Sequence, residues 1–300
     1  MKTYIGIDLG GTNVRCSTVQ MDGTVIETVK GPSHADEGAE AIISNIASMI
    51  RQLKDWQNAS GVGVAAPGPV ARDGNGMAMC TNIPCLAKFP LRETLQNELH
   101  LPCFLGNDAD AAGLAEALVG AGKGMRTVIY ITLSTGIGGA IVYNGQLLPG
   151  SHGYSMEVAS MSVDGSRPKI NLPANGAVED WASGTSVTRQ GHEKMPEQTI
   201  VHAGQVFDLA AQGVGAAAAI VDQVTTDLAV MFGNLATTID PDCFILGGGM
   251  MKSAGLFLPM VKEKYQARVL PALRDTAFLT ASLDEPGVVG AAMLPMSNGL

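Results

Sequence analysis

An acidic residue followed by two glycines lies near the start of the chain, in the stretch Tyr4-Ile5-Gly6-Ile7-Asp8-Leu9-Gly10-Gly11-Thr12. Its apolar residues predict a buried strand, and a charge at Asp8 in such a strand needs a cation or hydrogen-bond donors. Gly10 and Gly11 allow backbone N–H groups to approach an anion closely, and the Thr12 hydroxyl adds a donor. The stretch therefore indicates half of a phosphate site with Mg²⁺ held near Asp8. A plain glycine hairpin turn capped by Asp8 is the alternative interpretation.

A second glycine turn repeats this plan in the middle of the chain. An expected strand at 128–133 runs into Ser134-Thr135-Gly136-Ile137-Gly138-Gly139, and a further strand is expected at 140–143. The Asp22-Gly23 turn after the first copy corresponds to Asn144-Gly145 after the second. Two copies of one hairpin indicate an internal duplication, and hence two similar domains that each offer an N–H-rich turn.

A third glycine turn, Gly247-Gly248-Gly249, lies between an expected strand at 243–246 and an expected helix at 254–267. A glycine turn at the N-terminal side of a helix suits close contact with a nucleotide. Triple glycines also close tight strand-to-helix joints, so this turn alone does not decide between the two.

A pair of polar residues, Asn107 and Asp108, lies where an expected strand at 102–105 gives way to an alanine-rich helix at 111–119. The junction of a strand with a helix N-terminus is a favoured place for functional side chains. Asp108 could instead be the N-cap of that helix.

The remaining elements predict an α/β protein. Hydrophobic spacing and turn residues predict further strands at 14–20, 25–29 and 61–65, and helices at 37–56, 91–99, 205–212, 215–238 and 287–294, the last stopped by Pro295. The glycine-rich connection at 120–124 is the expected domain boundary. Segment 150–184 is the least regular, with only 178–182 helical, and such a long loop is usually functional or mobile.

Composition excludes several partners. The formal net charge of −9 and the pI near 5.0 leave no basic stripe for nucleic acid or an anionic membrane. The apolar segment 214–239 is interrupted by polar residues, so it is expected to be a buried helix. The five cysteines form no Cys-x-x-Cys pair and no signal peptide is visible. These features predict a soluble, cytoplasmic protein with reduced thiols.

The three glycine turns, Asp8 and the Asn107-Asp108 pair together resemble the ROK family of sugar kinases, within the actin, hexokinase and heat-shock ATPase superfamily. The resemblance extends over nearly the whole chain. It implies an α/β, two-domain actin-like (ribonuclease H-like) ATPase fold, with duplicated βββαβαβα domains around a cleft. It also implies a small domain of 1–119 plus 287–300 and a large domain of 120–286, and a homodimer.

The same resemblance assigns roles to residues. It implies a first phosphate motif with Asp8, Gly10, Gly11 and Thr12, a second with Ser134, Thr135, Gly136 and Gly138, and an adenosine motif with Gly247, Gly248 and Gly249. Asp108 becomes the general base, and Asp8 holds Mg²⁺ through water. Sugar contacts are implied for Gly68, Asn82, Asn107, Asp108, Glu157 and Glu179, because carboxylates and amides accept hydroxyl protons in fixed directions. For Glu157 and Glu179, hydrogen bonds that stabilise the loop remain the alternative role.

One departure from the family pattern concerns a zinc site. Many members hold Zn²⁺ in this loop with one His and three Cys, whereas the corresponding residues here are Ser160, Ile170, Leu172 and Ala177. We therefore expect no zinc, and we expect Ile170, Leu172, Ala177 and Trp181 to hold the loop by apolar packing. Met156 and Ala159 also occupy positions that often carry glycine, which leaves the identity of the sugar open.

The expected activity is transfer of the γ-phosphate of ATP to a hexose hydroxyl, at C6, with Asp108 as base and Mg²⁺ as cofactor. Within kinases, an N-acetylmannosamine or β-glucoside kinase is the alternative to a simple hexokinase. A sugar-responsive repressor is disfavoured, because no DNA-binding helix-turn-helix precedes the first phosphate motif. A catalytically inactive sugar-binding or ATP-binding module is the remaining alternative.

Overall fold

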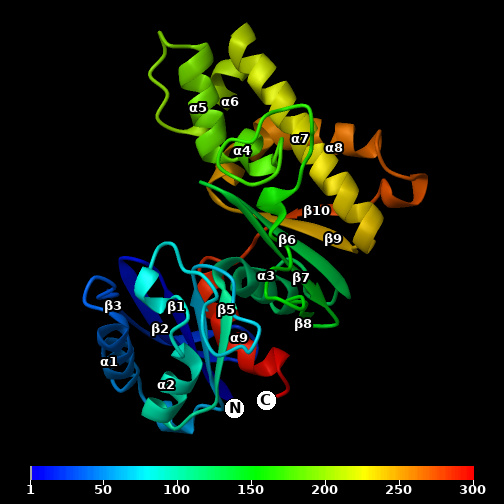
Figure 1. Ribbon diagram of the computed structural model, residues 1–300. Helices are drawn as coiled ribbons and strands as arrows, with labels where there is room; N and C mark the ends of the chain where they lie inside the picture. The colour runs from blue at the N-terminus through cyan, green and yellow to red at the C-terminus, as the bar shows by residue number, and fades with distance from the viewer. Residues whose placement is uncertain (1) are drawn as a thin grey trace. The chain divides into compact units, whose positions relative to one another are not determined.

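The computed structural model describes residues 2–300 and divides the chain into two compact units. The first contains residues 2–128, Ala140–Ser155 and Ser282–Leu300, and the second contains Ile129–Gly139 and Met156–Ala281. Figure 1 labels the helices and strands of both units. The chain therefore leaves the first unit and returns to it twice.

The first unit is built on a five-stranded sheet of order β3-β2-β1-β4-β5. Strands β1, β2 and β3 pair antiparallel, and β4 and β5 continue from β1 in parallel. The sheet and its helices comprise β1 (Thr3–Leu9), β2 (Asn13–Gln20), β3 (Val25–Pro32), α1 (Ala39–Ile50), η1 (Trp56–Asn58), β4 (Val62–Ala66), η2 (Pro84–Leu86), α2 (Leu91–Leu99), β5 (Cys103–Asn107), α3 (Asp108–Leu118) and α9 (Pro286–Ser297). The opening hairpin, the parallel strands and the helix after Asn107 confirm the sequence prediction for this half.

Alternation along β1 decides which helices cover which face. Ile5, Ile7 and Leu9 are buried in one cluster with α1 and α2, whereas Tyr4 packs with Ala292 of α9 on the opposite face. Because successive side chains of a strand point to opposite faces, Asp8 shares the α9 face with Tyr4. The Asp8 side chain is thus directed away from the larger apolar cluster.

Helix α9 packs so closely against β1, β4 and α3 that its backbone contacts theirs at glycine positions. A methyl group added at Gly290 would lie 1.7 Å from the Ala111 carbonyl oxygen, and one at Gly63 would lie 1.8 Å from the Ala291 carbonyl oxygen. Only glycine permits contacts this close, so these residues fix how α9 lies on the sheet.

A second five-stranded sheet has the order β10-β9-β6-β7-β8. The elements along this part of the chain are β6 (Thr127–Leu133), β7 (Ile137–Tyr143), β8 (Gln146–Leu147), η3 (Val158–Ser160), α4 (Val178–Ala182), α5 (Gly184–Lys194), α6 (Ala203–Ala211), α7 (Gly215–Ile239), β9 (Cys243–Gly247), η4 (Gly249–Ser253), α8 (Ala254–Gln266), η5 (Pro271–Leu273) and β10 (Ala277–Thr280). The recurrence of a hairpin around a glycine turn confirms the predicted repeat.

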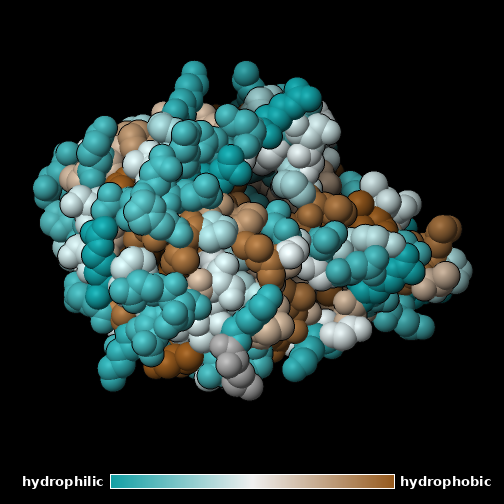
Figure 2. Space-filling model, turned by 90° about the horizontal axis from the view of Figure 1, so that it is seen from below, coloured by the Kyte–Doolittle hydropathy of each residue, from teal (hydrophilic) through white to brown (hydrophobic). Residues whose placement is uncertain are grey.

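Aromatic rings join α7 and α8 to β9 and β10 in the second unit. The rings of Phe232 and Phe244 lie 5.0 Å apart, and those of Tyr265 and Phe278 lie 5.1 Å apart, both edge to face. Helix α7 is the one helix in residues 2–300 that is long and apolar enough to cross a membrane by length and composition. Of its most apolar window, 56% is buried, which agrees with the expected core helix. On the face shown in Figure 2, hydrophilic residues surround smaller hydrophobic areas.

Several element boundaries differ from the prediction. The helix expected at 37–56 ends at Ile50, and a short 3-10 turn covers Trp56–Asn58. The last helix was expected to stop at Pro295, but it continues to Ser297 with Pro295 inside it. Pro295 has no N–H to donate to the Ala291 carbonyl, so the helix continues past it with one internal hydrogen bond missing. Helix α5 and strand β10 were not predicted at all.

Candidate active site

Asp8 lies in a group of charged side chains in the first unit. Burial, the largest effect, raises the pKa of Asp8, and the negative charges of Asp108 and Glu285 raise it further. Arg15 opposes this shift. Asp108 is therefore close enough to Asp8 for their charges to interact.

Two cations in this group were not predicted from the sequence. Strand register places Arg15 directly opposite Asp8 and Lys30 directly opposite Arg15. Glu285, which precedes α9, accepts from Lys30 at 2.9 Å and from Arg15 at 3.4 Å. Alternation of positions on β2 could have predicted Arg15, because it shares a face with Asp8; Glu285 comes from a distant part of the chain and could not be predicted.

The first glycine turn brings the Asn82 loop close to the phosphate motif. Gly10 N–H donates to the Asn13 carbonyl at 2.9 Å, which closes the turn. A methyl group at Gly11 would lie 3.0 Å from the backbone oxygen of Asn82. Thr12 accepts a backbone hydrogen bond from Ser33 at 2.9 Å. The predicted sugar residue Asn82 and the predicted phosphate turn are thus neighbours.

Gly68 adopts a backbone conformation that other residues rarely adopt, with φ of +99°. A methyl group there would lie 2.1 Å from the Met79 carbonyl oxygen. The turn that contains Gly68 therefore packs directly on the segment that leads to Asn82.

The N-cap of helix α3 is Asn107 and not Asp108. The Asn107 side chain is the N-cap of α3 and accepts from Asp110 N–H at 2.5 Å. Asp108 is the first residue of α3; one of its oxygens accepts from Ala109 N–H at 2.9 Å, and the residue is exposed. The N-cap interpretation of Asp108 is therefore wrong, and the Asp108 carboxylate is exposed to solvent.

In the second unit, the second and third glycine turns lie against each other. Gly248 has φ of +92°, and a methyl group there would lie 2.4 Å from the Leu133 carbonyl oxygen. A methyl group at Gly247 would lie 2.3 Å from the hydroxyl oxygen of Tyr130. Bulk at either position would separate the two turns, so the glycines are required for this contact.

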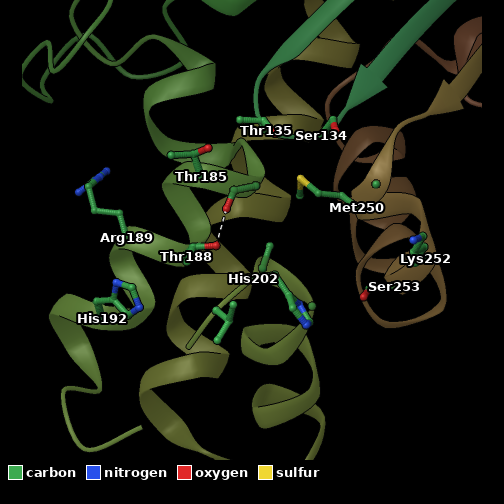
Figure 3. Close-up of a pocket in the computed structure, with 15 residues that line it drawn as sticks. Ser134, Thr135, Thr185, Thr188, Arg189, His192, His202, Met250, Lys252 and Ser253 are labelled. Atoms are coloured by element: carbon green, nitrogen blue, oxygen red, sulfur yellow. Dashed lines mark hydrogen bonds between the residues drawn. The ribbon is translucent and has the colours of Figure 1, made fainter. Parts of the chain in front are cut away.

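A cavity of about 660 Å³ opens beside these turns (Figure 3). Residues from the second turn, α5, α6 and η4 line it, and they include the predicted Ser134, Thr135 and Gly249. Thr185, Thr188, His192, His202 and Lys252 also line the cavity and were not predicted. Its size suits a nucleoside, and hydroxyl and imidazole groups offer hydrogen bonds to one. These residues were missed because they lie on α5 and on the turns that precede α6 and α8, where no motif marks them.

Glu179 and Glu157 occupy different surroundings. The Glu179 carboxylate accepts from Ile137 N–H, at the end of the second glycine turn, at 2.7 Å. Its oxygen lies 2.4 Å from the place a methyl group at Gly136 would occupy, so only glycine fits there. Glu157 is exposed and directly precedes η3. Glu179 therefore already makes a loop-stabilising contact, while its second oxygen is available for another partner.

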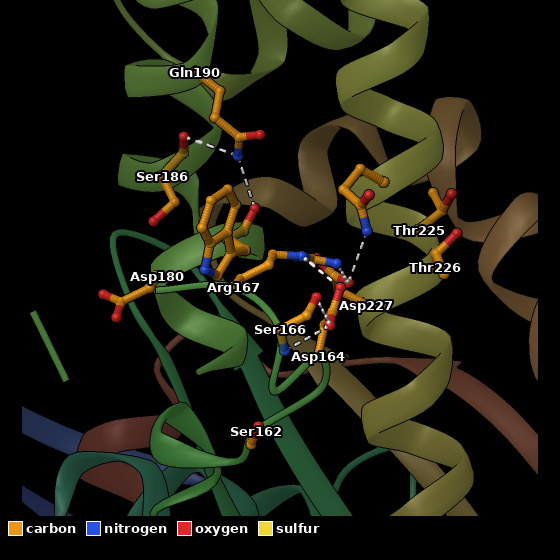
Figure 4. A network of polar contacts seen from close by, with 12 residues as sticks. Ser162, Asp164, Ser166, Arg167, Asp180, Ser186, Gln190, Thr225, Thr226 and Asp227 are labelled. Atoms are coloured by element: carbon orange, nitrogen blue, oxygen red, sulfur yellow. Dashed lines mark hydrogen bonds and ion pairs between the residues drawn. The ribbon is translucent and has the colours of Figure 1, made fainter. Parts of the chain in front are cut away.

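The loop between η3 and α4 is not held as the sequence suggested. Ile170 is 41% exposed, so the expected packing of Ile170 with Leu172, Ala177 and Trp181 is wrong for this residue; Ala177 alone of the four is fully buried. Charged side chains hold the loop instead, through Arg167 and Asp180 (Figure 4). Among residues 2–300, no group of three or more His, Cys, Asp or Glu side chains is arranged to hold a metal ion.

Three features define the class of protein to which this structure belongs. They are mixed sheets that start with an antiparallel hairpin, glycine turns at the ends of strands, and a carboxylate at a strand-to-helix junction. They are the features of the actin-like ATPase fold, which confirms the predicted fold class. The profile of the ROK family matches residues 4–297. The chain therefore belongs to the ROK family.

Individual relatives agree with this assignment. A glucokinase of Halalkalibacterium halodurans is 31% identical over 97% of this chain and 94% of that protein. The crystal structure of a ROK hexokinase from Thermus thermophilus aligns with a TM-score of 0.89 at 28% identity, covering 99% of this chain and 100% of that one. A ROK glucokinase from Streptomyces griseus, in complex with glucose and AMPPNP, aligns with a TM-score of 0.75 at 27% identity, covering 97% of this chain and 98% of that one.

Proposed function

We propose that this protein is an ATP-dependent sugar kinase that transfers the γ-phosphate of ATP to a hexose hydroxyl, at C6. The observation that carries this proposal is the environment of Asp108. Asn107 caps α3, so the exposed Asp108 carboxylate is left for chemistry, and it lies within electrostatic reach of Asp8. Family membership and kinase relatives across the whole chain support the same activity.

Asp108 acts as general base in this proposal. Its free oxygen accepts the proton of the sugar hydroxyl as that oxygen attacks the γ-phosphorus, and the bond from phosphorus to the bridging oxygen of ADP breaks. Asn107, whose side chain is fixed as the N-cap of α3 by its hydrogen bond with Asp110 N–H, orients the sugar. The Asn82 loop, which packs against Gly11, does the same. General-base assistance contributes roughly 10²–10⁴-fold, and positioning supplies much of the rest.

The phosphates are bound by backbone N–H groups and a cation. The turn of Gly10, Gly11 and Thr12 and the turn that begins at Ser134 present N–H and hydroxyl donors, and the nucleoside occupies the cavity beside Gly249. Asp8, with few competing donors, suits Mg²⁺, which proteins hold with one or two carboxylates together with substrate phosphates. When bound, Mg²⁺ neutralises phosphate charge.

The sugar ligands are Gly68, Asn82, Asn107, Asp108, Glu157 and Glu179. In this proposal Glu179 uses one oxygen for Ile137 N–H and the other for a sugar hydroxyl. We place the enzyme in the cytoplasm as a homodimer, with no zinc and no nucleic-acid or membrane partner. The net charge of −9 disfavours a nucleic-acid or membrane partner, and the free cysteines support the cytoplasmic location.

An ADP-release assay across glucose, fructose, mannose, allose, N-acetylmannosamine and a β-glucoside tests the proposal. We expect sugar-dependent ADP formation with at least one hexose, and the preferred sugar separates a hexokinase from an N-acetylmannosamine or β-glucoside kinase. No turnover with any of them, together with measurable sugar or nucleotide binding, would favour the inactive binding module.

A further inference from the structure

The irregular loop between Glu157 and Glu179 is closed at its base by backbone pairing. Val178 N–H donates to the Met161 carbonyl at 2.8 Å, and Val163 N–H donates to the Gly176 carbonyl at 2.9 Å. Glu157 lies just before this pairing and Glu179 just after it. The base of the loop therefore sets the spacing of the two carboxylates that the proposed function assigns to the sugar.

An arginine in the loop is anchored to helix α7. The Arg167 guanidinium donates two hydrogen bonds to Asp227, at 2.7 and 2.8 Å, and a third to Asp164 at 3.0 Å (Figure 4). The Arg167 side chain is 14% exposed and that of Asp227 is 1% exposed. Gln223 donates a further hydrogen bond to Asp227 at 3.0 Å. This is a parallel, two-bond arginine–carboxylate contact, the geometry with the greatest directional specificity for such pairs.

A second anchor acts on the tip of the loop. Asp180, 2% exposed, accepts the backbone N–H groups of Ile170, Asn171 and Leu172 at 3.2–3.3 Å. Asp180 belongs to α4, directly after Glu179. The tip is therefore attached to the same short helix that carries the proposed sugar ligand.

The two anchors meet at Trp181. The Arg167 guanidinium lies 5.0 Å from the centre of the Trp181 ring, within the range of a cation–π contact. Helix α4 has only five residues, too few to hold its own position, so its orientation depends on these contacts. Removing Arg167 would leave Asp227 buried without its cation, which strongly disfavours the closed loop.

We propose that Arg167, Asp227 and Asp180 form a loop clamp that positions Glu157 and Glu179 for the sugar, and that they are positioning residues for sugar affinity. This inference rests on the proposed kinase function. None of the three is among the residues that line the cavity beside Gly249, so the sugar is the ligand whose affinity they are expected to change. A loop held by these contacts keeps Glu157 and Glu179 in place without needing a bound metal ion.

The test is Arg167→Met, which keeps a long unbranched side chain and removes the positive charge. We expect the sugar KM, and the sugar Kd from calorimetry, to rise roughly 10- to 100-fold, the scale on which small misplacements act. The turnover number at saturating sugar and the Kd for AMPPNP should differ from those of the unaltered protein by less than about twofold. That is well below the tenfold change that corresponds to about 1.4 kcal/mol. The matched control is Arg51→Met, which breaks an exposed pair with Glu98 and should change none of these values.

Asp227→Asn keeps the side-chain volume and is the second variant, in case Arg167→Met does not fold. Both variants should also speed hydrogen exchange at the N–H groups of 170–172, a readout that needs no activity. A folded variant with faster exchange but unchanged sugar Kd would overturn the clamp as a positioning device, as would unchanged exchange. Absence of turnover by the unaltered protein with every sugar would instead contradict the kinase function, while sugar Kd and exchange would still decide the clamp.

Discussion

At the scale of single residues, the proposed function makes Asp108 the side chain that removes the proton. Asp108→Asn keeps the size and the first-turn position in α3 but removes the basic oxygen. We expect turnover to fall about 10²–10⁴-fold while sugar binding stays measurable by calorimetry. Asn107 still caps the helix in this variant, so the melting temperature should change little. Retention of full turnover would remove Asp108 from the role of base.

Asp8 gives a prediction about stability. Its pKa is raised in the folded protein by burial first, then by Asp108 and Glu285. Because ionised Asp8 is disfavoured on folding, it lowers the free energy of unfolding at pH values above its folded pKa, and the penalty disappears below the unfolded pKa of about 3.9.

Asp8→Asn should therefore raise the melting temperature at pH 7 and abolish activity, with the stability gain vanishing towards pH 3. Thermal unfolding across pH measures this. A melting temperature at pH 7 that falls in the variant would show that Arg15, and not burial, dominates the environment of Asp8.

Motif residues could be predicted because glycines and acidic residues at strand ends leave a local signature. Asp8, Asp108 and the glycine turns were identified in this way. Arg15 could have been predicted from the alternation of positions on β2, whereas Glu285 precedes a distant helix and is not visible in a local pattern. Asp227 offered a signal that was not used: a charge in the middle of an apolar helix needs a buried partner, and Arg167 is that partner.

At the scale of elements, close backbone packing fixes α9 on the first sheet. Gly290→Ala would place a methyl group 1.7 Å from the Ala111 carbonyl oxygen, so α9 or α3 must shift. We expect a loss of about 1–3 kcal/mol in the free energy of unfolding, the usual cost of overpacking, measured by chemical denaturation.

Gly255 of α8 is the matched control, because a methyl group there meets nothing within 4 Å. Gly255→Ala should be neutral or stabilise by about 0.4–1 kcal/mol. Equal effects of the two substitutions would show that backbone packing of α9 is not the source of stability.

Elements with strong periodicity, such as α2 and α7, could be predicted from the sequence nearly to the residue. Helix α5 could not be predicted, and neither could the contacts that hold the loop 161–177. Helix α5 has an apolar face of few residues, with Val187 its one fully buried large side chain. The loop depends on long-range ion pairs, and apolar composition alone led to the wrong expectation for Ile170.

At the scale of the whole molecule, the predicted site residues are divided between the two units. The first unit holds Asp8, Asp108 and the Asn82 loop, and the second holds Glu179 and the cavity beside Gly249. The internal duplication explains why both contain a glycine turn at the end of a strand. Phosphate binding by turns and a metal ion, with little basic charge, also agrees with a net charge of −9.

The proposed reaction moves the γ-phosphate of ATP to a hexose C6 hydroxyl, and phosphorus NMR of a mixture with the preferred sugar, ATP and Mg²⁺ tests it. We expect the γ-phosphate resonance of ATP to be replaced by a phosphate monoester resonance coupled to the two C6 protons, with ADP formed in equal amount. Formation of inorganic phosphate without a sugar phosphate, or a monoester at another carbon, would contradict it.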